Sequence, residues 1–428
     1  MSGSAAGAAA GTPLRDARYA RYVLGVLLVV YIFNFIDRII LGVLAPLIKA
    51  ELQFSDTQLG LLGGTAFALF YTALGVPIGW LADRRGRVWI MTTALAVWSA
   101  FTAVCGLAQS FVQLFLARVG VGVGEAGGVA PAYSLIADYF PPGQRARALA
   151  VYAFGIPIGS ATGLLFGGYI AARVNWRVAF IVVGLAGLLL TPLLRLTVRE
   201  PPRGGLDPAA SVVPATPAAV LRHLAGKPAF WGVSLAAASS SIMGYGLLFW
   251  MPSFLVRSYH LSLSQAAAQL GAIILVGGSA GVWLGGWLAD RIGRHNRAAY
   301  ALIPAASLLL SVPFYVAGVW LKPPGWGIAW FLVPTALGLT WLGPLTSAVQ
   351  QLVPASMRTT ASAILLFIVN LIGLGVGAVV IGALSDRLTF RYGPDGLGYA
   401  ILAGNSFYVV GAALLALSAR RLARDWEG

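Results

Sequence analysis

The stretch Gly79-Trp80-Leu81-Ala82-Asp83-Arg84-Arg85-Gly86-Arg87 decides the fold, because it occurs twice in this 428-residue chain. It returns as Gly286-Trp287-Leu288-Ala289-Asp290-Arg291-Ile292-Gly293-Arg294, with eight of the nine positions identical. A weaker echo is Ala383-Leu384-Ser385-Asp386-Arg387. Each strong copy follows the second long apolar segment of its half of the chain. Tandem halves with matching motifs are typical of secondary transporters, so the repeat predicts a duplicated membrane bundle.

Composition favours a lipid bilayer as the solvent of this chain. Hydrophobic residues make up 58% of it and charged residues only 10%, and its mean hydropathy is +0.82. Soluble domains carry about 25% charged residues. A soluble helical protein of this composition would expose large apolar patches and aggregate. We therefore predict an all-α, multi-pass integral membrane protein.

Apolar segments long enough to cross a bilayer recur along the whole chain, and such a crossing takes about 20 residues. There are twelve, at 22–47, 58–82, 88–108, 111–137, 148–171, 177–196, 228–256, 266–289, 298–320, 326–350, 359–385 and 397–419. The longest interruption is rich in Pro, Ala and charge, and it predicts a linker with a short surface helix near Ala218–Leu224. The expected organisation is an N-terminal tail (1–21), a six-helix bundle (22–196), the linker (197–227), a second six-helix bundle (228–420) and a C-terminal tail (421–428).

Basic residues indicate the orientation. The net charge of +15 would suggest a nucleic-acid partner in a soluble protein. Here, however, the basic residues flank apolar segments, where they act as topology signals. One side would hold the arginine groups at 15–21, 84–87, 291–297 and 420–424, and the other side only seven Lys and Arg. We therefore expect both termini and the linker in the cytoplasm, and no nucleic-acid partner. The excess of arginine over lysine points to a GC-rich bacterial genome, and so to the inner (plasma) membrane.

The duplicated loop resembles the signature Gly-x-x-x-Asp-Arg-x-Gly-Arg of the major facilitator superfamily, and the resemblance covers essentially 22–421. Leu116–Gly124 resembles the fourth-span motif of that superfamily, although Glu125 stands where a small residue is usual. Finer features are similar to the spinster-like lipid transporters, bacterial members included: Asn34-Phe35-Ile36-Asp37-Arg38, Gly124-Glu125-Ala126 and Asp138-Tyr139-Phe140-Pro141. This resemblance implies a carrier for a lysophospholipid or sphingosine-phosphate type of anion, with proton coupling.

Four charged residues are predicted to lie deep in the membrane: Asp37, Arg38, Arg118 and Glu125. A charge at that depth is costly unless it is paired or faces a wet cavity. We predict a relay in which Arg118 pairs with Asp37 in one state and with Glu125 in another. The proton affinity of a carboxylate depends on such a partner, so the exchange would couple protons to conformation. The alternatives are a structural ion pair at Asp37-Arg38 and a purely structural Arg118.

The repeated loop predicts a latch on the cytoplasmic side, made in one conformation and broken in the other. Its residues would be Gly79, Asp83, Arg84, Gly86 and Arg87 with Asp290, Arg291, Gly293 and Arg294. Asp83 would accept from Arg87 or cap a neighbouring helix, and Gly79 and Gly86 would allow close backbone approach. The alternative is a charge cluster that only fixes topology.

The C-terminal half predicts a neutral lining. Shifted by the repeat offset, Asp37 and Arg38 fall on Gly244 and Tyr245, so the charged pair has no counterpart there. The candidate lining residues of the C-terminal half are Ser240, Tyr245, Trp250, Trp341 and Asn370, and Asn34 is the candidate from the N-terminal half. For each of them, ordinary helix packing or an interfacial aromatic position is the alternative.

The sequence carries no catalytic or metal-ligand motif, so we expect no enzyme activity, no metal and no cofactor beyond a proton gradient. We expect a monomeric, proton-coupled, alternating-access carrier of an amphiphilic anion in contact with bilayer lipid. One alternative is a small organic-anion/proton symporter of the same superfamily, and another is a non-transporting membrane receptor.

Overall fold

The computed structural model describes residues 17–82, 84–202, 216–293, 295–321, 326–354 and 357–427, and these ranges contain helices and no strand. The N-terminal half consists of α1 (Ala17–Leu52), α2 (Asp56–Gly63), α3 (Thr65–Ala82), α4 (Arg87–Cys105), α5 (Phe111–Glu125), α6 (Val129–Tyr139), α7 (Pro142–Ala153), α8 (Gly155–Arg173) and α9 (Trp176–Thr197). The linker holds α10 (Pro217–Ala225). The C-terminal half begins with α11 (Pro228–Ser258), α12 (Leu263–Ile273), the π-helix η2 (Ile274–Gly278), α13 (Ser279–Gly293) and α14 (Ala299–Leu321). It continues with the 3-10 helix η3 (Trp326–Phe331), α15 (Leu332–Leu339), α16 (Leu342–Gln351), α17 (Arg358–Val369), the π-helix η5 (Asn370–Leu374), α18 (Gly375–Tyr392), the 3-10 helix η6 (Gly393–Asp395), α19 (Gly396–Gly404) and α20 (Ser406–Asp425).

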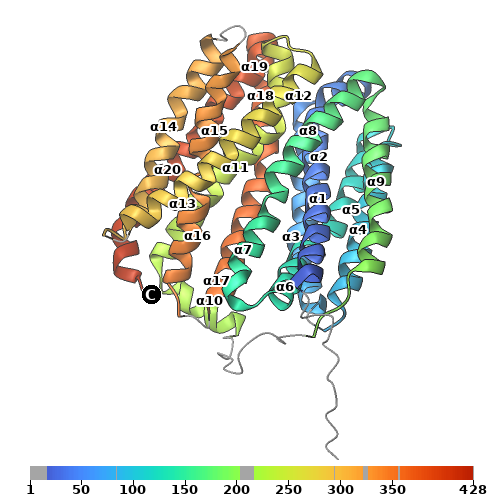
Figure 1. Ribbon diagram of the computed structural model, residues 1–428. Coiled ribbons are helices and arrows are strands. Elements are labelled where there is room, and N and C mark those ends of the chain that lie inside the picture. Colours follow the sequence, from blue (N-terminus) through green and yellow to red (C-terminus); the bar gives the residue numbers. More distant parts are fainter. Residues whose placement is uncertain are drawn as a thin grey trace, which may run out of the picture.

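The two halves stand side by side as two helix bundles (Figure 1). The start of α1, the linker helix α10 and the C-terminus lie at the same end, the lower one in Figure 1. We call this the linker end, and we call the opposite end, which holds the connection from α1 to α2, the far end. The expected short linker helix is present as α10.

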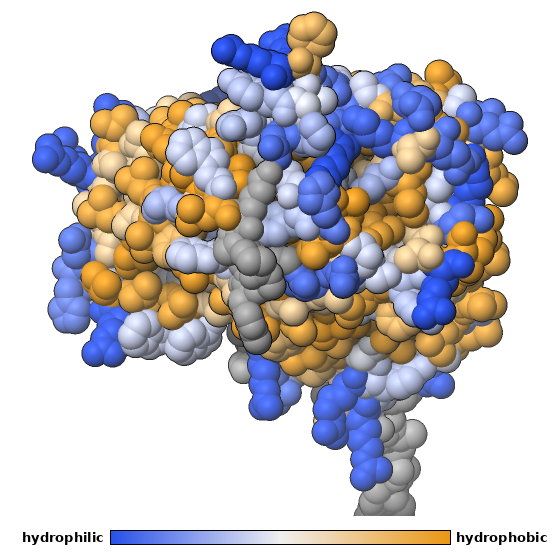
Figure 2. Space-filling view, turned by 90° about the horizontal axis from the view of Figure 1, so that it is seen from above, coloured by the Kyte–Doolittle hydropathy of each residue, from blue (hydrophilic) through white to orange (hydrophobic). Residues whose placement is uncertain are grey.

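Length and hydropathy make these helices membrane spans. Within the described residues, ten helical runs are long and apolar enough to cross a bilayer. Large apolar side chains lie on the outer surface, and Leu196 is 81% exposed. In the view from above, apolar residues lie along much of the rim of the molecule, with hydrophilic residues between them (Figure 2). This outer apolar surface is what a bilayer would cover.

Ten runs of spanning length are found in the described residues where twelve spans were predicted, and two local features account for the difference. Residues 111–139 form two shorter helices, α5 and α6, separated by a turn, so neither reaches spanning length by itself. The last run, Thr360–Asp425, is 66 residues long, and within it α18 and α19 pack against each other on either side of η6. That run therefore reverses direction.

The helix ends also differ from the expected boundaries. Helix α1 begins at Ala17 rather than at 22, and α20 continues to Asp425 rather than ending at 420. Asp425 is tied to the start of α11, because its carboxylate accepts a hydrogen bond from the Ala229 backbone at 3.2 Å. Trp426 packs on the ring of Tyr300 at 5.3 Å between centroids. These contacts hold residues that were expected to form a tail.

The two halves pack together mostly toward the far end. The pairs of helices that meet across the halves include α2 with α18, α8 with α12 and α1 with α11. Glycine makes the first of these contacts close, because a Cβ added at Gly60 would lie 2.5 Å from the Ala378 carbonyl oxygen. The seam between α2 and α18 thus requires a residue without a side chain at this position.

Candidate functional site

Asn34, Asp37 and Arg38 lie within α1, at the centre of the N-terminal half. Asn34 and Asp37 are buried, and the Arg38 side chain is 11% exposed. Adjacent positions on a helix point about 100° apart, so Asp37 and Arg38 face different neighbours. The structure therefore separates the two members of the pair that the sequence places together.

Arg38 binds Glu125 of α5. The Arg38 Nε atom donates to Glu125 Oε2 at 2.7 Å, and the Glu125 side chain is fully buried. Charge-assisted hydrogen bonds of this length are among the stronger ones in proteins. A direct Arg38–Glu125 bond was not part of the predicted relay, in which Glu125 was assigned to Arg118.

Asp37 lies beside Arg118. The distance from Arg118 Nη1 to Asp37 Oδ1 is 3.8 Å, which is longer than a hydrogen bond, and both side chains are buried. The Thr102 hydroxyl of α4 donates to Asp37 Oδ2 and also lies 2.9 Å from the Trp98 carbonyl oxygen. The structure thus brings all four predicted charges together as two neighbouring pairs, and it adds Thr102, which the sequence did not single out.

These buried charges retain hydrogen-bonding capacity. Within the described residues, several of their atoms have no hydrogen-bond partner: Asp37 Oδ1, Arg38 Nη2, Arg118 Nε and Nη1, and Glu125 Oε1. The Asn34 amide also makes no hydrogen bond of normal geometry there, although it is close enough to interact with the Glu125 carboxylate. Buried polar atoms almost always have partners. These atoms therefore have capacity for further hydrogen bonds.

Aromatic rings surround the Arg38 guanidinium. Its carbon lies 4.6 Å from the ring centroid of Tyr71, 5.1 Å from that of Phe67 and 5.2 Å from that of Phe35. Tyr31 and Tyr152 stack nearby at 4.2 Å. A cation over a ring face is stabilised by the ring quadrupole. The sequence did not predict that these three rings surround Arg38, because aromatic residues at helical spacing are common in membrane helices.

Glycines in α5 allow this close assembly. A Cβ added at Gly122 would lie 2.6 Å from the Phe67 carbonyl oxygen, and one at Gly124 would lie 2.5 Å from the Trp98 backbone nitrogen. These glycines let α3 and α4 approach α5 closely. Helix α5 sits against α3 and α4, so Arg118 and Glu125 reach α1 without a gap.

The C-terminal half contributes a neutral polar pair. The Tyr245 hydroxyl of α11 donates to Asn370 Oδ1 at 3.3 Å. Asn370 begins the π-helix η5, and such bulges often occur at functional sites. Ser240 and Trp341 are both buried, and the Ser240 hydroxyl has no hydrogen-bond partner among the described residues.

Trp250 corrects the predicted lining. Its side chain is 0% exposed, and its indole Nε1 donates to the Ala378 carbonyl at 2.8 Å. Trp250 therefore packs between α11 and α18 and is closed to any substrate in this conformation. The aromatic pattern of the sequence could not separate a packed tryptophan from a lining one.

The loop after α3 engages the N-terminal half and the linker. Arg87 is buried and bonds to Asp138, to the Ser134 hydroxyl at 2.8 Å and to Glu200 at 2.7 Å. Its Nη2 donates to the Pro201 carbonyl at 3.0 Å. The Glu200 carboxylate also accepts from the backbone of Val88 at 2.9 Å, so it caps α4. Asp83, which was expected to accept from Arg87 or to cap a neighbouring helix, lies outside the described residues.

The remaining predicted latch residues are spread over both copies of the motif. Arg84 lies over the Trp80 ring at 3.7 Å, and Arg291 lies over the Trp287 ring at 5.3 Å. Asp290 is exposed, and Arg294 lies outside the described residues. No described atom is within 4 Å of a Cβ added at Gly79, so the close approach expected there is absent in this conformation.

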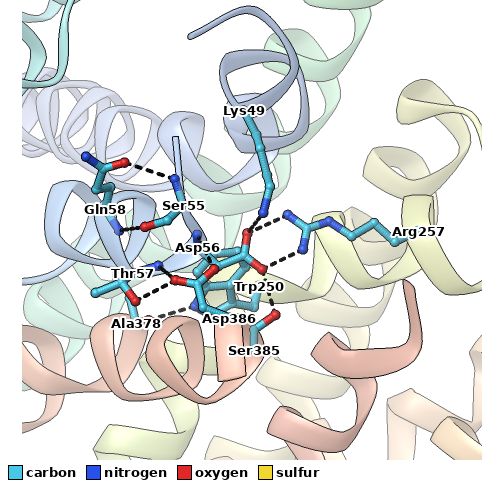
Figure 3. Close-up of polar contacts among 10 residues, drawn as sticks. All are labelled: Lys49, Ser55, Asp56, Thr57, Gln58, Trp250, Arg257, Ala378, Ser385 and Asp386. Atoms are coloured by element: carbon cyan, nitrogen blue, oxygen red, sulfur yellow. Dashed lines mark hydrogen bonds and ion pairs between the residues drawn. The ribbon is translucent and has the colours of Figure 1, made fainter. Parts of the chain in front are cut away.

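The far end holds a second charge cluster, centred on Asp56, that the sequence did not reveal (Figure 3). The Asp56 carboxylate is 1% exposed and accepts from Lys49 at 2.5 Å, from Arg257 at 2.7 and 2.8 Å, and from the Ser385 hydroxyl at 2.6 Å. Asp386 accepts from the backbones of Asp56 at 2.9 Å and Thr57 at 2.8 Å. The cluster therefore joins α1 and α2 of one half to α11 and α18 of the other. The sequence feature that pointed to this cluster was the weaker copy of the repeated motif at 383–387, which contains Asp386.

Other ligand sites are sparse. Among the described residues, no group of three or more His, Cys, Asp or Glu side chains could hold a metal ion. A pocket of about 460 Å³ lies at the far end of the C-terminal half, lined by Phe254, Val319, Trp320, Leu321, Asp395, Gly398 and Tyr399. None of these residues belongs to the buried charge site.

Several known proteins are similar to this chain in sequence and in architecture. The chain matches the family model described as Major Facilitator Superfamily over residues 27–378. It is 34% identical over 409 residues to an MFS-type efflux pump of Mycolicibacterium smegmatis, and the alignment covers 95% of this chain and 94% of the pump. It is 31% identical over 398 residues to human Protein spinster homolog 1, with 87% of this chain and 74% of that protein covered. The crystal structure of a bacterial homolog to the human lysosomal transporter Spinster, inward-facing and unoccupied, matches with a TM-score of 0.88 at 32% identity, covering 96% of this chain and 99% of that chain.

Proposed function

This chain belongs to the Major Facilitator Superfamily and is a transporter of the Spinster type, and we propose that it moves an amphiphilic, lipid-like anion by proton-coupled alternating access. The anion would be of the lysophospholipid or sphingoid-phosphate class. One observation carries the proposal: the Arg38–Glu125 pair, bonded at 2.7 Å, lies buried at the centre of the N-terminal half.

Arg38 is the proposed anion-binding group. Its Nε is held by Glu125, while its Nη2 has no hydrogen-bond partner among the described residues. A guanidinium offers a planar fork of donors that suits phosphate and carboxylate groups. A substrate anion would therefore compete with Glu125 for the same cation, which makes Glu125 the gatekeeper of the site.

Glu125 is the proposed proton carrier. A proton on its carboxylate would cancel its charge and weaken its hold on Arg38, so the guanidinium would become free for the anion. Loss of that proton would restore the ion pair and release the anion. Asp37 and Arg118, 3.8 Å apart, would serve as a second pair that keeps the site near neutrality. Without the Asp37 charge, an uncompensated Arg118 would hold Glu125 in its ionised form, so the coupling would need both carboxylates. The cycle would need a proton gradient and no other cofactor.

The substrate tail would face the C-terminal half. Tyr245 and Asn370 supply neutral hydrogen-bonding groups opposite the charged half. The half-buried rings of Phe35 and Tyr71 add aromatic surface on the near side. A site with charge on one wall and apolar or neutral groups on the other suits an amphiphile with one anionic head.

The proposed topology has twelve spans with both termini in the cytoplasm, in a bacterial inner membrane. Residues 111–139 would form the fourth span despite the turn between α5 and α6. The final helical run would supply two spans. Because the halves pack together toward the far end, the proposed conformation is closed there and faces the cytoplasm. We expect the transporter to work as a monomer.

Transport into proteoliposomes tests this function. Uptake of a radiolabelled lysophospholipid, a sphingoid phosphate and a small dicarboxylate would be compared with and without a pH gradient. The expected result is gradient-dependent uptake of at least one lipid-like anion, with the gradient dependence lost in Asp37→Asn and Glu125→Gln. Glu51→Gln is the matched control, because Glu51 binds Trp176 and Arg177 away from this site. Intact gradient dependence in both site variants would refute the proton relay.

A second candidate is efflux of a small amphiphile, favoured by the 34% identity to the Mycolicibacterium smegmatis efflux pump. A third, the small organic-anion/proton symporter, predicts uptake of the dicarboxylate in preference to either lipid. Adding a lipophilic cation to the same assay separates the first two candidates. Export of the cation with no movement of either lipid would favour the efflux function.

A further inference from the structure

The far-end cluster around Asp56 is built from charges that divide evenly between the two halves. Lys49 and Asp56 belong to the N-terminal half, on α1 and α2, and Arg257 and Asp386 belong to the C-terminal half, on α11 and α18. Each half thus contributes one cation and one anion. When the halves separate, neither one carries away an uncompensated charge.

Six hydrogen bonds cross between the halves in this cluster (Figure 3). Two come from Arg257 and one from Ser385 to the Asp56 carboxylate, and three join Asp386 to Asp56 and Thr57. A carboxylate at a helix N-terminus is favoured by the helix dipole, and Asp386 occupies this place at the start of α2. The closed far end therefore depends on both charged residues of the C-terminal half, Arg257 and Asp386.

We propose that Asp56 is the centre of a far-end gate that opens by exchange of charge partners. In the closed state Asp56 binds Arg257 and Asp386 caps α2. In the open state Asp56 keeps Lys49 alone, and Arg257 turns to Asp386. The inference rests on the alternating access of the proposed function.

Geometry favours both pairs of the open state, one of which already exists and one of which is new. Lys49 already bonds to Asp56 at 2.5 Å, and only residues 53–55 separate their helices, so they stay together when the halves part. Arg257 and Asp386 both bind the same residue, Asp56, one through its carboxylate and the other through its backbone nitrogen. Their helices α11 and α18 pack together within one half. A side-chain rotation is enough to join them once Asp56 leaves.

This exchange predicts opposite effects for two substitutions that remove a cation from the same carboxylate. Arg257→Gln removes a partner that exists only in the closed state, so it should raise the ratio of open to closed far ends. Lys49→Gln removes the partner on which the open state depends, and it also ends the competition with Arg257, so it should lower that ratio. Breaking one side of a buried ion pair is costly, and each shift should reach about tenfold.

Distances between spin labels measure the gate directly. Cysteines at Ala50 and Phe390 would carry the labels in a chain with Cys105→Ala, because both positions are exposed at the far end on opposite halves, Phe390 at 99%. Double electron–electron resonance on the full chain in liposomes then gives the fractions of short and long distances. Arg177→Gln is the control, since Arg177 pairs with Glu51 inside one half at the same end and should leave the distribution unchanged.

The outcomes separate this gate from the proposed function. Opposite shifts in Arg257→Gln and Lys49→Gln support the exchange, and a smaller opening shift in Ser385→Ala, which removes one crossing bond, supports it further. A long-distance fraction that rises in Lys49→Gln as well would overturn the exchange, because Lys49 would then be one more closing contact. A single short distance in wild type and in every variant, with or without a pH gradient, would refute alternating access itself. If Arg257→Gln fails to fold, the Lys49→Gln and Ser385→Ala pair gives the same decision.

Discussion

Arg38 and Glu125 are 87 positions apart in the sequence, yet their side chains meet in a 2.7 Å hydrogen bond inside the N-terminal bundle. The contact joins α1 to α5 and leaves Asp37, the neighbour of Arg38, to face Arg118 and Thr102. Two carboxylates and two arginines therefore share one buried region without forming a single chain of bonds. In the proposed transport cycle, this separation would let the Arg38–Glu125 pair respond to substrate while the Asp37–Arg118 pair stays intact.

Glu125→Gln should separate anion binding from proton coupling. The amide keeps the shape of the carboxyl group but has no charge, so it holds the Arg38 guanidinium less tightly. We expect the affinity for the anion to rise about tenfold while the pH-gradient dependence of uptake disappears. Binding measured by isothermal titration at neutral pH, alongside uptake, checks both. Arg38→Gln is the comparison, and it should abolish anion binding; unchanged affinity in both variants would contradict the competition.

Thr102→Val should weaken the fold around Asp37. Valine matches threonine in shape but lacks the hydroxyl that donates to the Asp37 carboxylate. Removing one partner of a buried charged group costs about 1–3 kcal/mol, so the midpoint of thermal unfolding in detergent should fall. Thr102→Ser keeps the hydroxyl and is expected to retain most of that stability. If Thr102→Ser were as unstable as Thr102→Val, the loss of stability would come from packing and not from the missing hydrogen bond.

Sequence reasoning located the charged residues but not all of their partners. The cost of burying a charge singled out Asp37, Arg38, Arg118 and Glu125, because the chain is otherwise apolar around them. Which cation meets which anion depends on the rotation of each helix about its axis, and composition does not encode this. The resemblance to the Spinster family, drawn from short motifs, is confirmed by relatives that cover most of the chain.

Contacts between the halves were the hardest to foresee. Asp56 follows a span end, where an acidic residue is normally solvated, and it is buried where α2 packs against α18 and Arg257 of α11 binds its carboxylate. Trp250 was misassigned for a related reason, because an aromatic residue in a membrane helix faces lipid, cavity or neighbour according to tertiary packing. Local sequence patterns predicted the helices and the duplication. The contact between the two halves depends instead on residues more than 200 positions apart, such as Asp56 and Arg257.

Gly122→Ala should disturb the position of α5 and with it the charge site. The added methyl would lie 2.6 Å from the Phe67 carbonyl oxygen, so α5 and α3 must separate. Overpacking of this kind costs about 1–3 kcal/mol, and the thermal midpoint should fall together with transport. Gly75→Ala is the matched control, since no described atom lies within 4 Å of its Cβ position. Equal stability of the two variants would show that α5 tolerates the shift.

Arg87→Gln should destabilise the linker end more than any neighbouring arginine substitution. The Arg87 guanidinium is buried between Asp138, Glu200 and the Ser134 hydroxyl, so its loss removes the bonds to all three groups at once. Breaking one side of a buried pair costs about 3–5 kcal/mol, measured as a lower thermal midpoint of the purified protein.

Arg84→Gln provides the control for this prediction, because Arg84 is exposed and stacks over Trp80, and none of the acidic side chains in the described part of the chain pairs with it. Its effect should stay within about 0.5 kcal/mol. Arg87→Lys keeps the charge but not the planar fork that reaches Glu200, Ser134 and the Pro201 carbonyl together, so it should recover only part of the loss. Full recovery in the lysine variant would mean that charge alone holds the linker, whereas equal losses in the Arg84 and Arg87 variants would mean that the buried cluster adds nothing to stability.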